Sequence, residues 1–228
     1  SSEGVWVPAL SGACCVAAFL VRQDRISHPL IYLGVFRARQ YRAAFVAQNC
    51  LFASFMGITL IVPLFIENIW GGTALEAGLV LLPGTIAALF INPLAGYLTD
   101  RFHARPVIVF FGACLAFGSV AMAFMDASTP FWLILLLQGI RACGVSGLVS
   151  PLTSWSMEEL APNRMTDASS FSTAIRQAIA SMGTALMVFS ITLGAQAFGS
   201  LLFGFQLALG LSGVFALALF VIALVRVR

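Results

Sequence analysis

The sequence predicts an all-α integral membrane protein with about seven transmembrane helices. Of its 228 residues, 60% are hydrophobic and 9% are charged, whereas a soluble domain carries about 25% charged residues. Charged and turn-forming clusters divide the chain into apolar segments near the length of about 20 residues that a spanning helix needs. Basic residues fall in alternate loops, so the formal charge of +3 is interpreted as a topology signal and not as a nucleic-acid-binding signal.

The expected spanning segments are separated by short loops. They are, in chain order, residues 4–21, 43–66, 77–99, 106–125, 131–153, 168–194 and 200–225. No loop is long enough to bury a core of its own, which excludes a soluble extramembrane domain. Residues 23–42 form a basic stretch that we expect to be a cytoplasmic linker lying along the headgroup interface.

The arginines set the expected orientation, because cytoplasmic loops retain basic residues and translocated loops lose them. One side of the membrane is expected to hold Arg22, Arg25, Arg37, Arg39, Arg42, Arg101, Arg105, Arg164, Arg226 and Arg228. The charged residues expected on the other side are all acidic, namely Glu3, Glu67, Glu76 and Asp126. We therefore expect a plasma-membrane protein whose amino end is outside and whose carboxyl end is cytoplasmic.

The most specific motif lies at the cytoplasmic turn between the third and fourth expected helices. The run from Gly96 to Arg105 reads GYLTDRFHAR and fits G-x-L-x-D-R-x-x-x-R. Gly96 permits close helix approach, Asp100 can accept hydrogen bonds, and Arg101 and Arg105 can anchor the turn at the anionic leaflet. A generic positive-inside loop is the alternative interpretation.

At these residues the chain resembles the major facilitator superfamily, whose signature turn has this form. Further stretches resemble the carboxyl half of its fourteen-helix drug:proton antiporter branch, namely LLPG at 81–84, NPLAG at 92–96, QGIRACG at 138–144, SPLT at 150–153, ASS at 168–170, IRQ at 175–177 and GTAL at 183–186. The resemblance implies that residues 43–228 form the six-helix C-terminal bundle. Residues 1–22 would be a linker transmembrane helix and 23–42 the basic linker.

The resemblance also implies a function. The chain would be one half of a bacterial inner-membrane transporter that exports lipophilic drugs by alternating access, exchanging them for protons. It starts at Ser1 without an initiator Met, and we expect a missing N-terminal half. Two other functions stay open: transport of an anionic solute on the same fold, and a non-transporting receptor or assembly subunit.

The sixth expected helix carries a polar stripe at helical spacing. The stripe consists of Ser169, Ser172, Thr173, Arg176, Gln177, Ala180, Gly183 and Thr184. The opposite, lipid-compatible face consists of Phe171, Ile175, Met182, Leu186 and Phe189. A polar stripe in hydrocarbon faces protein or a water-filled cavity. Helix packing through the hydroxyls is the alternative.

Two arginines lie too deep to reach the headgroups. Arg176 is roughly 13 Å from the cytoplasmic edge by helical rise, and Arg141 is near the middle of the fifth expected helix. An intramembrane Arg costs from about 3 to more than 10 kcal/mol without a counter-charge or water. Arg176, Gln177, Thr173, Arg141, Gln138, Asn49 and Asn92 are therefore candidate substrate-pathway residues. For Arg141, bonding to carbonyls across a helix interface remains equally open.

Glu158 and Glu159 follow the fifth expected helix on the same side as Asp100, Arg101 and Arg105. We hypothesise an ionic latch among them that holds one transport conformation, together with Gly96 as part of the cytoplasmic gating motif. A solvated loop is the alternative.

The sequence favours no enzyme and no cofactor or metal. It contains no G-x-x-x-x-G-K-[ST] motif, and His28 and His103 have no ligand spacing. No Asp or Glu lies in mid-helix to carry a proton. The expected partners are a small-molecule substrate, protons, the lipid bilayer and the missing half, without nucleic acid.

Overall fold

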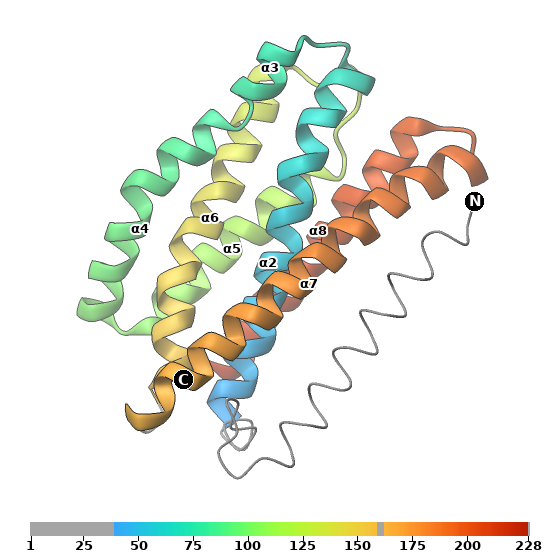
Figure 1. The fold of residues 1–228 in the computed structure, drawn as a ribbon. Helices are drawn as coiled ribbons and strands as arrows, with labels where there is room; N and C mark the ends of the chain where they lie inside the picture. The colour runs from blue at the N-terminus through green and yellow to red at the C-terminus, as the bar shows by residue number, and fades with distance from the viewer. Residues whose placement is uncertain (1–38, 159–161, 228) are drawn as a thin grey trace.

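The computed structural model describes residues 39–158 and 162–227. The predicted segment 4–21 and most of the predicted linker 23–42 lie outside these residues. The described helices are α2 (Arg39–Phe65), η2 (Ile66–Trp70, a π-helical turn), α3 (Ala74–Leu79), α4 (Leu82–Phe102), α5 (Ala104–Met122), α6 (Phe131–Met157), α7 (Pro162–Ala197) and α8 (Leu201–Arg226). Figure 1 shows them as one antiparallel bundle.

Six of these helical stretches are long and apolar enough to cross a membrane. Each coincides with one of the six segments predicted between residues 43 and 225. The described part of the chain contains only helices, turns and loops. The prediction of an all-α membrane fold is therefore confirmed, and the remaining predicted helix, residues 4–21, lies outside the residues that the structure describes.

The helix boundaries differ from the prediction in two places. The first described helix begins at Arg39, so residues 39–42 of the predicted linker are helical. The predicted segment 77–99 is broken into α3 and α4, and Pro83 lies in the first turn of α4. Proline is tolerated there because its missing N–H would have no partner in the helix. A capping box formed by Thr73 and Glu76 fixes the start of α3.

The helices pack in an order that leaves two of them at the edges. Helix α5 packs on α6 and α8. Helix α8 also packs on α2 and α7. Helix α4 packs mainly on α6, and α7 packs on α2 and α8 (Figure 1). Only 11% of the α4 span and 22% of the α7 span are buried, against 39% or more of every other described span. The bundle thus leaves α4 and α7 largely uncovered.

Glycines bring α5 and α6 into close contact. A Cβ atom added at Gly144 would lie 2.5 Å from the Leu115 nitrogen, and one at Gly147 would collide with the ring of Phe111. A Cβ at Gly118 would lie 2.9 Å from the Arg141 nitrogen. The contact at Gly118 fixes the backbone of Arg141 against α5.

The polar stripe of α7 faces two environments. Ser172, Ala180 and Gly183 are buried, whereas Thr173 and Gln177 are exposed. The prediction that Phe171 faces lipid is wrong, because its side chain is buried and stacks on Phe45 of α2 with 6.1 Å between ring centroids. Phe171 directly precedes the buried Ser172 in α7, so it lies at the edge of the helix face that α2 covers.

The two ends of the bundle carry opposite charges. Arg39 begins α2, Arg101 and Arg105 flank the α4–α5 junction, and Arg226 ends α8. Arg39, Arg42 and Arg226 line one cleft between the ends of α2 and α8. The opposite end carries Glu67, Glu76 and Asp126. The alternation of helix direction thus gathers the arginines at one end, as the loop charges predict.

Candidate functional site

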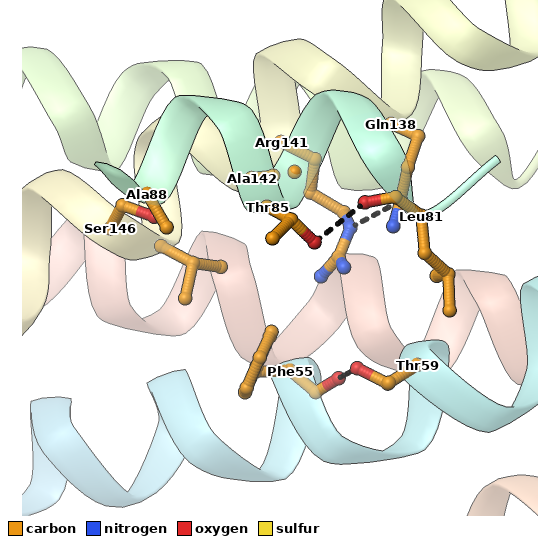
Figure 2. Close-up of a pocket in the computed structure, with 11 residues that line it drawn as sticks. Phe55, Thr59, Leu81, Thr85, Ala88, Gln138, Arg141, Ala142 and Ser146 are labelled. Atoms are coloured by element: carbon orange, nitrogen blue, oxygen red, sulfur yellow. Dashed lines mark hydrogen bonds between the residues drawn. The ribbon is translucent and has the colours of Figure 1, made fainter. Parts of the chain in front are cut away.

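A cavity of about 300 Å³ lies between α2, α4 and α6 (Figure 2). Its lining residues are Phe55 and Thr59 from α2, Leu81, Gly84, Thr85 and Ala88 from the start of α4, and Gln138, Arg141, Ala142, Val145 and Ser146 from α6. Apolar side chains and methyl groups make up most of the wall. A few polar groups in an apolar cavity of this size are typical of a small-molecule site.

Arg141 is the only charged residue that lines this cavity among the described residues. It is 1% exposed, and its Nε atom donates a hydrogen bond to Gln138 Oε1 at 3.1 Å. Its Nη1 atom is buried and has no hydrogen-bond partner within the described part of the chain. Arg141 lies ten residues into α6, which corresponds to about 15 Å of helical rise. A guanidinium is therefore held at membrane depth with unused bonding capacity.

Neighbouring helices hold Arg141 and the cavity wall in place. Helix α5 touches the Arg141 backbone at Gly118, as described above. Helix α4 approaches α6 at Gly84, where an added Cβ would lie 3.0 Å from the Ala142 Cβ. The hydroxyls of Thr59 and Thr85 donate to the carbonyls of Phe55 and Leu81, one turn earlier in each helix. These contacts fix the cavity shape without neutralising the arginine.

Arg176 lies outside this cavity. Its guanidinium sits over the Phe52 ring, 4.4 Å from the centroid, and its Nη2 atom donates to Thr173 Oγ1 at 3.4 Å. Phe52 in turn meets Phe55 edge-on at 6.4 Å, and Phe55 lines the cavity. The two deep arginines therefore lie on either side of an aromatic pair on α2.

Four amide side chains are among the candidates, and they lie in different places. Asn49 is buried, donates to the Phe45 carbonyl at 2.8 Å and lines a separate pocket toward α7 and α8. Asn92 is exposed on α4. Gln138 alone joins Arg141. The sequence-based prediction placed these residues in one substrate pathway. The structure divides them between a cavity, a second pocket and an outer face.

The gating motif is arranged differently from the predicted latch. Arg101 donates to the Tyr97 hydroxyl at 3.0 Å and stacks over Phe102. Glu158 accepts a hydrogen bond of 2.8 Å from Gln40, which also donates to the Trp155 carbonyl.

Gly96 faces Ser150 with room for a Cβ at 3.9 Å, while Asp100 and Arg105 are exposed. In this conformation α2 and α6 are thus joined by Gln40 and Glu158. The ionic latch stays a prediction for another conformation.

Phe55, Thr59, Thr85 and Ser146 were not predicted as site residues. A signal exists in α6, where Gln138, Arg141, Val145 and Ser146 follow helical spacing on one face. The lining residues at the start of α4 also follow helical spacing and share one face, namely Leu81, Gly84, Thr85 and Ala88. What the sequence lacks is the information that these particular faces meet.

No three His, Cys, Asp or Glu side chains come together to hold a metal ion within residues 39–158 and 162–227. The fold and the cavity instead define a polytopic helical membrane protein with a ligand-sized site inside its span, which is the arrangement of a transporter bundle.

Comparison with known proteins identifies the family. The model of the Major Facilitator Superfamily matches residues 5–184 and 44–228. The chain belongs to the Major Facilitator Superfamily, a transporter family.

Curated relatives include transporters and resistance proteins. The uncharacterized MFS-type transporter YhcA of Bacillus subtilis is 30% identical over 77% of this chain and 33% of its own length. Multidrug resistance protein Stp of Mycobacterium tuberculosis is 28% identical over 80% of this chain and 33% of its own length. Lincomycin resistance protein LmrB of Listeria monocytogenes is 24% identical over 86% of this chain and 42% of its own length. The chain thus spans about two fifths or less of these relatives.

Among solved structures, an auto inhibited POT family peptide transporter is similar, with a TM-score of 0.65 and 20% sequence identity. The match covers 82% of this chain and 37% of that one. At this identity the likeness concerns the fold alone.

Proposed function

We propose that this chain is the C-terminal bundle of a proton-coupled exporter of lipophilic compounds. The observation that carries the proposal is the mid-span cavity with mainly apolar walls between α2, α4 and α6. An apolar cavity at this depth suits compounds that partition into the bilayer. The names of LmrB and Stp, which refer to lincomycin resistance and multidrug resistance, support the same class of substrate.

A second bundle is part of the proposal. Helices α4 and α7 are 11% and 22% buried, so they offer two long faces that an amino-terminal bundle can cover. Alternating access then consists of rocking one bundle against the other around a fixed site. The carboxylates whose side chains the structure describes lie at helix ends or in turns, so the proton-carrying acid is expected in the other bundle.

Within this scheme the outlying candidates flank the route to the cavity. Arg176 and Thr173 stand beside Phe52 on α7, and Gln177 and Asn92 are exposed on the two uncovered helices. Asn49 would serve the second pocket. The arginine-rich end is assigned to the cytoplasm of a bacterial inner membrane.

The latch of Asp100, Arg101, Arg105 and Glu158 belongs to the opposite transport conformation in this proposal. Asp100→Asn combined with Glu158→Gln should change transport and the accessibility of cysteines placed near Gly96. Unchanged transport and accessibility in the double variant would remove the latch from the mechanism.

Flux measurement tests the function directly. The chain, supplied with an amino-terminal bundle, is reconstituted in proteoliposomes containing a lipophilic dye. An imposed pH gradient should drive dye movement, and a protonophore should abolish it. A non-transporting subunit predicts no flux under any gradient, and that result would end the exporter proposal.

A further inference from the structure

The unusual feature of the cavity is a positive charge without a negative partner. Arg141 is enclosed by this bundle, and its Nη1 atom has no partner among the described residues. Its Nε atom is oriented by Gln138. Figure 2 shows the side chain reaching from α6 into the space between α4 and α2. A buried donor without an acceptor is destabilising, so an acceptor that the described residues do not supply would stabilise Arg141.

No residue of the cavity wall can supply that counter-charge. The lining contains no carboxylate. The acidic residues whose side chains the structure describes lie at helix ends or in turns, namely Glu67, Glu76, Asp100, Asp126 and Glu158. The nearby threonine hydroxyls of Thr59 and Thr85 are uncharged and already donate to their own helices. The guanidinium therefore lacks an anion from within the described chain.

The remaining wall specifies the rest of the ligand. Phe55, Leu81 and Val145 form apolar surfaces around the guanidinium. A carboxylate matches the paired donors of a guanidinium, and the bond is strengthened in a site without bulk water. We infer that this cavity selects amphipathic organic anions, with the ligand carboxylate on Arg141 and an aromatic or aliphatic body against the apolar wall.

A ligand fits this position better than an acidic residue from a second bundle. Arg141 is only 1% exposed in this chain alone, so the cavity encloses it before any other bundle is added. A side chain fixed on another helix would have to enter between α2, α4 and α6. A small anion needs only to diffuse in. The inference rests on the proposed function, because it names the class of compound that the exporter cavity takes.

The test compares two probes that differ in charge. The chain is placed in phosphatidylcholine nanodiscs, and binding of naphthylacetate and of neutral naphthylethanol is measured with correction for partition into empty discs. Charge-assisted hydrogen bonds favour the carboxylate by about tenfold or more in affinity. Arg141→Gln should abolish this preference.

Two further variants make the result specific. Arg226→Gln removes an equal charge at the cytoplasmic end of α8 and should keep the full preference. Gln138→Glu places a carboxylate beside the retained arginine and should also abolish the preference. This variant decides the question if Arg141→Gln fails to fold, because the added ion pair compensates the buried charge instead of removing it.

The outcomes separate this inference from the proposed function. Equal binding of both probes to the unmodified chain would overturn the anion site and leave the lipophilic cavity intact. A preference that survives in Gln138→Glu or in folded Arg141→Gln would also overturn it, because the charge responsible would then lie elsewhere. Absence of binding by either probe would overturn both proposals.

Discussion

At the scale of the residue, Arg141 is a charge held where a charge is costly. An Arg near mid-bilayer costs from about 3 to more than 10 kcal/mol when unpaired. Gln138 satisfies one of its donors, and the close approach of α5 at Gly118 fixes its backbone. The backbone of Arg141 is thus fixed by a residue of another helix, and its guanidinium is oriented by a residue of its own helix.

Gly118→Ala should destabilise the bundle. The added Cβ would lie 2.8 to 2.9 Å from Arg141 atoms, two of them backbone atoms, and overpacking of this kind costs about 1–3 kcal/mol. Thermal unfolding in detergent measures the change. Gly78→Ala on α3 is the matched control, because nothing lies within 4 Å of its Cβ position. Equal unfolding of both variants would contradict the close contact.

The sequence could identify Arg141 as exceptional, because charge and depth are both readable from the chain. Helical spacing could also have added Ser146 to the same face. The sequence could not separate Arg141 from Arg176. Both are deep arginines on polar faces, and only packing shows that Arg176 rests on Phe52 while Arg141 faces the cavity.

At the scale of the element, polar contacts join helices that lipid alone would not hold together. The Tyr41 hydroxyl and Ser172 Oγ lie 2.8 Å apart and connect α2 to α7. Ser54 and Ser212 do the same for α2 and α8 at 2.6 Å. Such bonds stabilise helix association by about 0.6 kcal/mol on average and about 1.7 at most.

A double-mutant cycle measures the first of these contacts. Tyr41→Phe and Ser172→Ala should be coupled by about 0.6 kcal/mol in unfolding free energy, because each removes the same hydrogen bond. Tyr41→Phe with Thr184→Ala should be additive, since the Thr184 hydroxyl donates to Ala180 within its own helix. Additivity in the first pair would show that the Tyr41 contact contributes nothing.

Helix positions followed from hydropathy, because each spanning helix must be about 20 apolar residues long. Hydropathy does not locate the break between α3 and α4, since Val80 and Leu81 are as apolar as their neighbours. Pro83 was the available signal. The burial of Phe171 was missed because its character suits lipid and a protein interface equally.

At the scale of the whole molecule, the bundle has two uncovered edges. Leu89 on α4 is 70% exposed, and Phe117 on α5 is 62% exposed. Exposure of a single side chain does not separate a lipid-facing position from an interface. The low burial of the spanning segment Ala74–Phe102, which contains α4, is what distinguishes it from α5: 11% of its most apolar stretch is buried, against 50% for α5.

Cysteine labelling distinguishes the two faces. In a background without the native cysteines, Leu89→Cys should lose reactivity toward a lipid-soluble maleimide when an amino-terminal bundle is joined. Phe117→Cys should react equally with and without that bundle, because α5 faces the bilayer. If Leu89→Cys remained fully reactive, α4 would not be an interface helix.

The fold class and the family could be predicted from the sequence. Composition and loop charge are properties of the whole chain, and the run from Gly96 to Arg105 is a local motif, so none of them requires knowledge of how the helices pack. The pairing of helix faces could not be predicted. It depends on small contacts such as Gly84 with Ala142 and Gly144 with Leu115, which become meaningful only when the partner helix is known.

The central claim is that the cavity between α2, α4 and α6 receives the lipophilic compound, and ligand protection at Thr85 tests it most directly. Thr85 is exposed and lines the cavity, so Thr85→Cys should be alkylated readily in the cysteine-free background. Naphthylethanol at about ten times its dissociation constant should slow that alkylation about tenfold. Leu75→Cys on α3, which is 72% exposed and lies outside the cavity, should be alkylated at an unchanged rate. Unchanged alkylation at Thr85→Cys under saturating ligand would contradict the account.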